Sequence, residues 1–300
     1  MREFSNKVAA ISGAASGFGR EFALEAAARG MHLALADVQE EPLHAFADEL
    51  RAKGHRVLCS LCDVSKAEQV QAWADAAFTE FGAVHLLFNN AGVGCGGLLW
   101  ENSLADWEWV LGVNLWGVIH GVKYFTPRML QAARDDANYQ AHIVNTASMA
   151  GLLNAPLLGA YNVSKHAVVA LSESMFQDLQ LQCKAVAVSV LCPYFVSTGI
   201  SRSHLQRPAD LQNAQAPSNS QLLAQNMVDK AVKSSHVSAQ KVAQLTFGAI
   251  EQGRFYIYSH PDALQGVQER MEDVLQGNNP RDPYASAPQI AERLRQGLQA

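Results

Sequence analysis

A tyrosine and a lysine lie four residues apart in the segment Tyr161-Asn-Val-Ser-Lys165. On a helix this spacing places both side chains on one face, one turn apart. A cation beside a buried phenol favours the phenolate, so the pair can accept a proton near neutral pH. Ser148, which follows a short apolar segment upstream, adds a hydroxyl group. With the glycines near the N-terminus, these residues point to hydride transfer involving an alcohol or a carbonyl group.

A cluster of glycines, Gly13-Ala-Ala-Ser-Gly17-Phe-Gly19, follows the first apolar segment. Glycines permit a tight turn and a close approach to a pyrophosphate, and the helix that starts here offers free N–H groups and a positive dipole. Such a cluster can also be a plain turn between a strand and a helix. Asp37 favours the nucleotide interpretation, because it ends the second apolar segment about 20 residues on, where a carboxylate can bind ribose hydroxyls.

Asp37 also bears on the choice of dinucleotide. A carboxylate at this position repels a 2′-phosphate. No Arg or Lys stands ready to bind that phosphate, because the neighbour is Val38 and the glycine turn carries Ala15 and Ser16. We therefore predict NAD(H) in preference to NADP(H).

The proton chemistry at Tyr161 requires a large pKa shift. An unperturbed tyrosine has a pKa of about 10, so only about 0.1% of it is phenolate at pH 7. Lowering that pKa by about 3 units takes roughly 4 kcal/mol of preferential interaction with the anion. We expect Lys165 and the positive nicotinamide ring of NAD+ to supply a large share of this energy.

The elements that must position these residues alternate along the chain. Near-continuous apolar strands that alternate with helices predict an α/β fold, a Rossmann-type doubly wound parallel sheet of about seven strands with helices on both faces. The strands are expected at 7–12, 32–37, 56–62, 84–89, 142–146, 185–191 and 254–258. The helices are expected at 19–29, in a stretch ending near 53, and at 66–81, 103–130, 159–182 and 237–251, the last with Ser238 as its N-cap.

Two segments differ from this alternating pattern. From Ser201 to about Ser220 the chain is rich in Gln, Asn, Ser, Ala and Pro, which predicts a loop or loosely helical excursion within 199–235. After His260-Pro-Asp262 we expect an amphipathic helix and a polar tail. We predict a single domain, in which residues 1–260 bind the dinucleotide and catalyse the reaction and residues 261–300 form a C-terminal helical extension.

Composition argues against several classes of function. The 300-residue chain is 49% hydrophobic and 17% charged, and its formal net charge of −5 comes without a basic patch for nucleic acid. No apolar run approaches the ~20 residues of a membrane span. Cys59 and Cys62 form a C-x-x-C inside a predicted strand, without the second Cys or His pair that a zinc site needs. We expect no metal, no membrane, no nucleic acid and, from the scattered thiols, a cytoplasmic location.

Four motifs occur in the order and at the spacing of one known family. They are the glycine turn, the segment Asn89-Asn90-Ala91-Gly92, Ser148 with Asn114 before it, and Tyr161 with Lys165. In these motifs the chain resembles the short-chain dehydrogenase/reductase family, from about Lys7 to Val196 and again in the last predicted strand.

The resemblance implies a role for each motif residue. Tyr161 is expected to be the catalytic acid/base, and Lys165 to bind the nicotinamide ribose and lower the pKa of Tyr161. Ser148 is expected to orient the substrate oxygen, and Asn114 to anchor a water molecule of a proton relay. The glycines would frame the pyrophosphate, Asp63 and Val64 would flank the adenine, Asn90 would line the ribose side, and 193–198 would contact the carboxamide. The expected cofactor residues are Gly13, Ser16, Gly17, Phe18, Gly19, Asp37, Asp63, Val64, Asn90, Ala91, Gly92, Tyr161, Lys165, Pro193, Val196 and Thr198.

Two residues depart from the family pattern. Phe18 stands where a small aliphatic residue is common, and Tyr194 follows Pro193 where glycine is usual. Tyr194 is bulky and is expected to narrow or shape the substrate pocket. Apolar residues nearby predict a hydrophobic or aromatic secondary alcohol or ketone, with the excursion as a lid, although several of the leucines could instead pack the core. These residues are Leu152, Leu153, Leu157, Leu158, Tyr194, Phe195 and Ile200.

Two other functions stay open from the sequence, an NADPH-dependent carbonyl reductase and a catalytically silent dinucleotide-binding sensor. The intact set of Asn114, Ser148, Tyr161 and Lys165 argues against the sensor, which has no need of an acid/base pair. The resemblance also implies a homodimer or homotetramer, in which the helices that carry Asn114 and Tyr161 form one interface.

Overall fold

Seven short strands form one sheet in which every neighbouring pair is parallel. The computed structural model describes residues 1–285 and 287–299, and its strand order is β3-β2-β1-β4-β5-β6-β7. The order reverses direction between β1 and β4, and sheets of this kind bind ligands at the carboxyl ends of the strands beside such a point. The strands are β1 (Val8–Ser12), β2 (His32–Asp37), β3 (Val57–Leu61), β4 (Leu86–Asn89), β5 (Ala141–Thr146), β6 (Val186–Cys192) and β7 (Tyr256–Tyr258).

The central strands are buried along their whole length because both faces of the sheet are covered. Every residue of β1, β4 and β5 is buried, so these strands show no alternation between a core face and a solvent face. In the register, Ile11 of β1 pairs with Leu35 of β2 on one side and with Phe88 of β4 on the other. The edge strand β3 is only partly buried.

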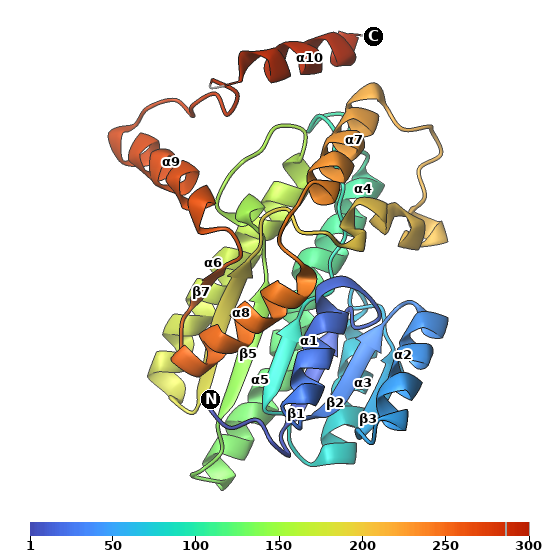
Figure 1. The fold of residues 1–300 in the computed structure, drawn as a ribbon, viewed down its shortest axis with the longest axis vertical. Coiled ribbons are helices and arrows are strands. Elements are labelled where there is room, and N and C mark those ends of the chain that lie inside the picture. Colours follow the sequence, from blue (N-terminus) through green and yellow to red (C-terminus); the bar gives the residue numbers. More distant parts are fainter. Residues whose placement is uncertain (286, 300) are drawn as a thin grey trace.

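Helices cover both faces of this sheet, as Figure 1 shows, and the predicted fold class is confirmed. The two faces have separate apolar clusters, one built around Phe22 and Phe247 and the other around Trp73 and Phe125. The helices of the first face are α1 (Gly17–Ala28), α2 (Glu40–Ala52) and α8 (Ala239–Gln252). Those of the second face are α3 (Ala67–Phe81), α5 (Gly117–Asp135) and α6 (Gly159–Gln182).

The segment predicted as one helix at 103–130 consists of three consecutive pieces. α4 (Leu104–Leu111) continues into a π-helical turn at Gly112–Trp116, after which α5 begins. A π turn places one extra residue in the helix and is frequent at functional sites. The prediction of a regular helix was wrong at this point, because the spacing of apolar residues does not report which carbonyl each N–H bonds. Asn114 lies inside the π turn.

The excursion contains more helix than the sequence indicated. Two 3₁₀ segments at Gly199–Gln206 and Ala209–Leu211 are followed by α7 (Asn219–Lys233). α7 begins at a capping box in which Ser218 accepts from the backbone N–H of Gln221 and the Gln221 side chain accepts from that of Ser218. This Ser-x-x-Gln spacing is a helix-start signal, and the polar composition of the segment obscured it.

The C-terminal segment forms two helices where one helix and a polar tail were expected. α9 (Leu264–Gln276) projects away from the sheet, and α10 (Pro288–Gln299) lies across the end of α7 (Figure 1). α10 and α7 are closely packed, since a Cβ added at Gly297 of α10 would lie 2.9 Å from Leu223 of α7. Within residues 1–285 and 287–299, none of the helices combines the length and the apolarity that crossing a bilayer requires.

The aromatic stack on the first face offers a test of this core. Phe88 is completely buried, with its ring centroid 4.4 Å from that of Phe22 and 5.8 Å from that of Phe247. We expect Phe88→Ala to lower the free energy of unfolding by about 3–5 kcal/mol, because the cavity it leaves is walled by rigid neighbours. Urea unfolding followed by circular dichroism measures this loss.

The control for that experiment is Leu181→Ala, since Leu181 is 88% exposed. A surface change of this kind is expected to stay within about 0.5 kcal/mol. Equal unfolding midpoints for the two variants would contradict the packing described for Phe88.

Candidate active site

One large cavity opens at the carboxyl ends of the central strands. Loops that follow β1, β4, β5 and β6 form one wall, and the excursion, α7 and the segment from α9 to residue 285 form the other. Its volume is about 1870 Å³, whereas pockets for a single drug-sized ligand measure roughly 300–1,000 Å³. The cavity is therefore large enough for two ligands side by side.

Almost all the residues singled out from the sequence line this cavity. The exceptions are Gly19 and Asn114, which lie behind its wall. The lining includes Gly13, Ser16, Gly17, Phe18, Asp37, Asp63, Val64, Asn90, Ala91, Gly92, Ser148, Tyr161, Lys165, Pro193, Val196 and Thr198.

The glycine turn after β1 is packed too tightly for side chains. A Cβ at Gly19 would collide with the carbonyl oxygen of Gly13, and one at Gly13 would lie 2.9 Å from the Cα of Ala91. Gly17 has a φ of +53° and faces Thr198, whose Cβ would lie 3.6 Å from an added methyl group. The turn thus brings bare backbone to the cavity surface between the ends of β1 and β6.

The N-terminus of α1 points free N–H groups into this turn. Its N-cap residue, Ser16, makes no capping hydrogen bond with its side chain, and the first turn carries no acidic residue. Unpaired N–H groups and the positive end of the helix dipole make such a terminus suitable for an anion. A pyrophosphate group fits this arrangement.

Asp37 at the end of β2 is held in a fixed orientation beside the glycine turn. It is 6% exposed, and its two carboxylate oxygens accept hydrogen bonds from the backbone N–H groups of Ala15, at 2.9 Å, and Gln39, at 3.0 Å. These bonds aim the carboxylate across the turn, so a ligand here meets a negative charge that cannot easily swing away. No Lys or Arg in the described chain forms an ion pair with Asp37.

The end of β1 and the loop after β4 meet around the middle of the cavity. Ser12 accepts hydrogen bonds from the backbone N–H groups of Asn90, at 2.9 Å, and Ala91, at 3.1 Å. The side-chain amide of Asn90 donates to the carbonyl of Ser12 at 3.0 Å. Asn90 therefore has two roles in the structure: it lines the cavity, and it fastens the loop after β4 to the end of β1.

The Asp63–Val64 pair, expected at the adenine, lies at the far end of the cavity. The carboxylate of Asp63 accepts from the N–H of Ser65 at 2.9 Å, which makes a tight turn at the start of α3. The carbonyl of Val64 contacts Nδ1 of His120 on α5 at 2.8 Å. The wall at this end is therefore built by packing between the α3 and α5 layers.

Lys165 is buried and has a single hydrogen-bond partner in the described chain. It is 3% exposed, and its Nζ donates to the carbonyl oxygen of Thr146 at 2.8 Å. The same nitrogen lies 5.7 Å from the centroid of the Tyr161 ring. Burial lowers the pKa of Lys165 to about 8, and the charge of the Cys192 thiolate form acts in the opposite direction.

The pKa of Tyr161 moves in the direction opposite to that expected from the sequence. Burial raises it, and a hydrogen bond with Ser148 offsets only part of the increase. Lys165 is not among the causes of the shift, because its ammonium lies over the ring and donates to the carbonyl of Thr146 rather than to the phenol oxygen. In the protein by itself, Tyr161 is therefore a neutral phenol.

Ser148 caps the short 3₁₀ turn Met149–Gly151 that follows β5. Its Oγ accepts from the N–H of Ala150 at 3.1 Å and donates to the carbonyl of Pro193 at 3.3 Å. These contacts fix the hydroxyl between the ends of β5 and β6, next to Tyr161. Both hydroxyl groups line the cavity, an arrangement that suits hydrogen bonding to one oxygen atom.

Asn114 is completely buried and its side chain is almost fully paired. Its Oδ1 accepts from the N–H of Val93 at 2.8 Å, and its Nδ2 donates to the carbonyl of Val93 at 3.0 Å and to Oγ of Ser164 at 3.1 Å. Ser164 in turn donates to the carbonyl of Tyr161 at 2.8 Å. The amide thus ties the loop after β4 to the helix that carries Tyr161 and Lys165.

Five of the seven apolar residues that the sequence predicted around a substrate line the cavity. Leu152 and Leu157 are only 7% and 8% exposed and lie outside the lining, so for these two the core-packing alternative holds. The residues that do line it are Leu153, Leu158, Tyr194, Phe195 and Ile200.

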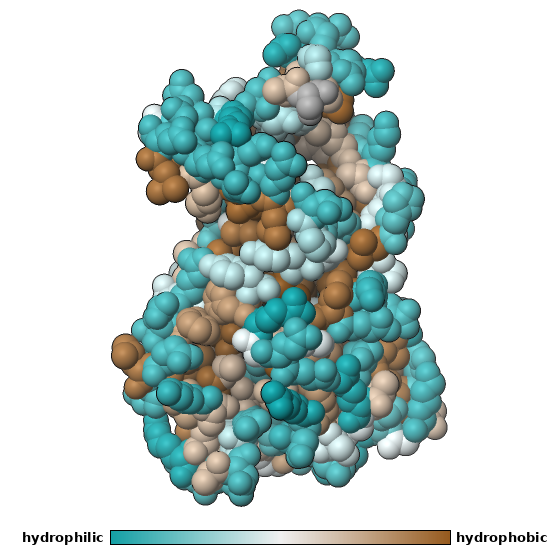
Figure 2. Space-filling model, turned by 60° about the vertical axis from the view of Figure 1, so that its left-hand side comes forward, coloured by the Kyte–Doolittle hydropathy of each residue, from teal (hydrophilic) through white to brown (hydrophobic). Residues whose placement is uncertain are grey.

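Sequence reasoning missed the part of the wall that comes from the C-terminal segment. Gly266, Arg270 and Asn278 line the cavity, and a Cβ at Gly266 would lie 3.6 Å from Leu153. The amphipathic pattern of α9 was visible in the sequence, but it does not say which surface the helix faces. Figure 2 shows apolar surface in the hollow between the C-terminal segment and the part of the molecule that contains the sheet.

The described residues contain no cluster of three or more His, Cys, Asp or Glu side chains that could hold a metal ion. All five cysteines are free thiols, including Cys59 and Cys62. The polar groups at the centre of the cavity are a hydroxyl, a phenol and an ammonium, which suit proton transfer and hydrogen bonding to an oxygen.

Comparison with known proteins agrees with this geometry. A model of the short chain dehydrogenase family matches residues 7–209. A short-chain dehydrogenase/reductase from Burkholderia phymatum, solved in complex with NAD, is 53% identical and superposes with a TM-score of 0.91 over 94% of this chain and 99% of that chain.

Two relatives match over most of their length. The CLA biosynthesis dehydrogenase/reductase of Lactiplantibacillus plantarum is 34% identical over 283 residues, 93% of this chain and 97% of the relative. The 1-deoxy-11-beta-hydroxypentalenate dehydrogenase of Streptomyces exfoliatus is 34% identical over 270 residues, 89% of this chain and 88% of the relative. The chain therefore belongs to the short-chain dehydrogenase/reductase family of oxidoreductases.

Proposed function

We propose that this protein is an NAD-dependent dehydrogenase and ketone reductase that acts on a hydrophobic or aromatic secondary alcohol and the corresponding ketone. The observation that carries the proposal is the meeting of two sites in one cavity. A glycine turn flanked by Asp37 lies at one end, and Ser148, Tyr161 and Lys165 lie together in the middle. The space beyond them is left for the substrate. Its apolar lining consists of Leu153, Leu158, Tyr194, Phe195 and Ile200, and polar side chains of the excursion and of the C-terminal segment complete the wall.

The residues present fit a dinucleotide. Backbone N–H groups of the glycine turn and of α1 would hold the pyrophosphate, and Asp37 would accept hydrogen bonds from the hydroxyls of the adenosine ribose. Asp63 and Val64 would flank the adenine, and Lys165 would donate to the second ribose. Pro193, Val196 and Thr198 would face the carboxamide. The NAD bound by the Burkholderia phymatum relative supports the choice of NAD over NADP.

Bound nicotinamide supplies the hydride chemistry, and the chain supplies orientation and proton transfer. In the oxidation direction, Tyr161 would take the hydroxyl proton while Ser148 holds the same oxygen by a hydrogen bond. In the reduction direction, Tyr161 would return the proton to the carbonyl oxygen. Lys165, whose pKa of about 8 leaves it protonated at neutral pH, would keep a positive charge beside the phenol.

Because the pKa of Tyr161 is raised, the bound cofactor must contribute stabilisation of the phenolate. Since burial disfavours the phenolate in the protein by itself, the positive charge of NAD+ has to supply most of the lowering of the pKa that the sequence analysis divided between Lys165 and the nicotinamide ring. The proton acceptor is thus completed by cofactor binding, which couples acid/base chemistry to an occupied nucleotide site.

The proton taken by Tyr161 needs a route to solvent. Both Nδ2 hydrogens of Asn114 are used, and one Oδ1 lone pair is taken by Val93. A water molecule beside Lys165 can therefore be held by the remaining lone pair or by a backbone carbonyl of the π turn. Gly92 leaves room for it, because a Cβ there would lie 3.4 Å from Asn114 Oδ1 and 3.5 Å from Lys165 Nζ.

The role of Tyr161 is tested by Tyr161→Phe. The variant keeps the ring and its packing but removes the acid/base group, so kcat is expected to fall by about 10²–10⁴-fold. The melting temperature and the dissociation constant for NAD+ are expected to stay close to wild type. A spectrophotometric assay of NADH formation over a panel of secondary alcohols gives kcat, and turnover near the wild-type rate would refute the assignment.

The cofactor preference is tested through Asp37. Wild type is expected to have a higher kcat/KM for NAD+ than for NADP+, and Asp37→Asn to lose about tenfold with NAD+ by weakening charged hydrogen bonds to the ribose. The NADP+ value is expected to rise, because the charge that repels the 2′-phosphate is gone. Asp75→Asn is the matched control, since Asp75 pairs with Arg128 outside the cavity. A wild type that prefers NADP+ would favour the carbonyl reductase alternative.

We also propose that the protein is a homodimer or homotetramer built through α5 and α6 and the π turn before α5. Trp116 and Val163 are large apolar residues that are 51% and 48% exposed on these elements. Light scattering coupled to size-exclusion chromatography is expected to give at least a dimer for wild type and a smaller species for Val163→Arg. Leu61→Arg, on the edge strand, is the control, and a monomeric wild type would contradict the proposal.

Two further points about the whole chain complete the proposal. We place the C-terminal segment in the same domain as the sheet, because α10 packs on α7 and residues from α9 to 285 line the cavity. We place the protein in a reducing compartment, the cytoplasm, because all five of its cysteines are free thiols.

A further inference from the structure

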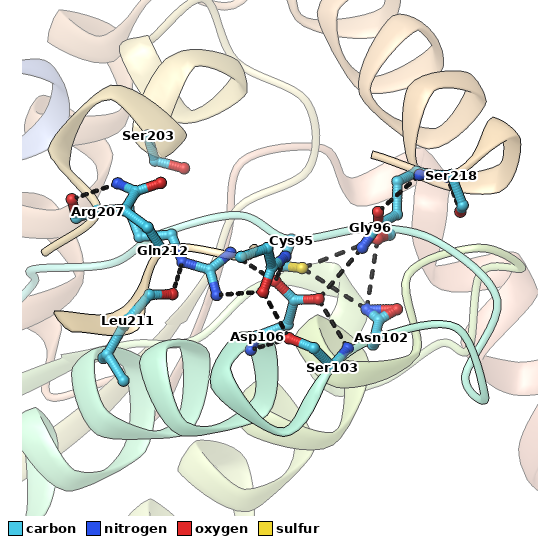
Figure 3. Close-up of polar contacts among 12 residues, drawn as sticks. Cys95, Gly96, Asn102, Ser103, Asp106, Ser203, Arg207, Leu211, Gln212 and Ser218 are labelled. Carbon is cyan, nitrogen blue, oxygen red and sulfur yellow. Dashed lines mark hydrogen bonds and ion pairs between the residues drawn. The ribbon is translucent and has the colours of Figure 1, made fainter. Parts of the chain in front are cut away.

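Three side chains of the excursion donate hydrogen bonds to a single carboxylate on α4. Oδ1 of Asp106 accepts from Nη1 of Arg207 at 2.5 Å and from Nδ2 of Asn213 at 2.9 Å. Oδ2 accepts from Nε2 of Gln221 at 3.1 Å and from the N–H of Ser103, the N-cap of α4, at 2.9 Å. Figure 3 shows Asp106 at the centre of these contacts, with Arg207 reaching it from the excursion. One residue therefore fastens the excursion at three points spread over fifteen residues of chain.

The ion pair at the centre of this network is buried. The side chains of Asp106 and Arg207 are 1% and 9% exposed, and the guanidinium also lies 5.2 Å from the ring centroid of Trp109. Its Nε donates to the carbonyl of Leu211 at 2.6 Å, which closes the turn after the first 3₁₀ segment. Removing one partner of such a pair leaves a buried charge unpaired and is strongly unfavourable.

Asp106 is ionised at neutral pH, because its pKa lies below the usual value for an aspartate. Burial raises the pKa of Asp106, but hydrogen bonds from Arg207, Asn213 and the N–H of Ser103 outweigh it, so the net shift is downward. The attachment is thus charged at neutral pH and is made of charge-assisted hydrogen bonds, which are stronger than neutral ones.

The same part of the excursion is tied to the loop that contacts Asn114. Oγ of Ser203 accepts from the N–H of Gly94 at 2.8 Å and donates to its carbonyl at 3.3 Å. The preceding residue, Val93, is bonded through both backbone groups to Asn114. Gly94 is therefore held by Ser203 of the excursion, and its neighbour Val93 is held by Asn114 of the π turn.

The fastened segment is a wall of the cavity on the substrate side. Ile200, Ser203, Leu205, Arg207 and Gln221 all line it, and Ser203 joins this wall to the loop 92–96 through Gly94. Its position sets the width of the space that is left for the substrate. The nucleotide end is held by other contacts, those of Asp37 with Ala15 and of Ser12 with Asn90.

We propose that Asp106 is a positioning residue for the substrate: its carboxylate, through Arg207, Asn213 and Gln221, fixes the excursion as the substrate-side wall and so sets affinity for the alcohol but not for the dinucleotide. This inference rests on the proposed function in taking that end of the cavity as the substrate site. The fastening itself is a property of the chain and is measurable without turnover.

The experiment compares Asp106→Asn, Arg207→Met and Arg207→Lys with wild type by hydrogen–deuterium exchange and by steady-state kinetics. Amides of 199–221 are expected to exchange about tenfold faster in the first two variants, with the sheet unchanged and Arg207→Lys in between. With 1-phenylethanol as probe, KM is expected to rise about tenfold while kcat changes about twofold or less. The dissociation constant for NAD+, from fluorescence titration, is expected to stay within about twofold of wild type.

Ser238→Ala is the matched control, because it removes a helix N-cap of α8 that has no contact with the excursion. It loses about 1 kcal/mol of stability and is expected to leave both the exchange of 199–221 and the KM for the alcohol unchanged. If Asp106→Asn does not fold, Asn213→Ala takes its place. It removes the hydrogen bonds of Asn213 with Asp106, Arg207 and the hydroxyl of Ser103, and it keeps the two hydrogen bonds between Ser103 and Asp106 that cap α4.

Unchanged exchange of 199–221 in the variants would overturn the inference, as would faster exchange spread over the whole chain. A loss of NAD+ affinity as large as the rise in KM for the alcohol would also overturn it. If wild type turns over no alcohol, the proposed function fails, and the exchange of 199–221 still decides whether Asp106 holds the excursion.

Discussion

The hydrogen bond from Lys165 to the carbonyl of Thr146 is the contact on which the rest of the site depends. It joins α6 to the carboxyl end of β5 across the interior, and it gives one N–H of the buried ammonium a partner, which reduces the cost of burying this charge. With Lys165 fixed, Tyr161 lies one turn earlier on the same face of α6, beside Ser148. The close approach also needs Gly151, because a Cβ there would lie 2.6 Å from the carbonyl oxygen of Lys165. One corner of the cavity is thus built by the Lys165–Thr146 hydrogen bond, by the four-residue spacing of Tyr161 and Lys165, and by the absence of a side chain at Gly151.

The sheet explains why residues far apart in sequence reach that corner. In a parallel sheet all carboxyl ends lie on one edge, so the glycine turn, Asp37, Asn90, Ser148 and Pro193 follow different strands and still line one cavity. Each is anchored to a neighbouring strand or loop by backbone contacts, such as those of Ser12 with Asn90 and Ala91. The sheet side of the cavity is therefore built from strand ends that are bonded to one another, and the wall opposite the sheet comes from the excursion and the C-terminal segment.

The sequence predicted the sheet and most of the site because both leave local signals. Apolar runs of strand length, glycines at turns and the spacing of Tyr161 and Lys165 each report their own structure without knowledge of distant partners. The features that the sequence did not predict leave no such local signal or depend on distant contacts. The π turn at Asn114 depends on a change in hydrogen bonding that leaves no apolar pattern, and α7 was hidden by polar composition despite its capping box at Ser218. The pKa of Tyr161 depends on burial and on where the ammonium of Lys165 points, which only the folded chain decides.

The π turn at 112–116 also has a consequence for the helix that contains it. Each residue advances a regular α-helix by about 100° around its axis, so one extra residue in a turn rotates every later side chain relative to the earlier ones. Before the turn, α4 presents Asp106 to the excursion, and after it, α5 presents Phe125 to the interior beside the sheet. A straight helix through the same residues would lose the alignment of one of these two faces. The π turn therefore allows one continuous helical segment to present Asp106 to the excursion and Phe125 to the core beside the sheet.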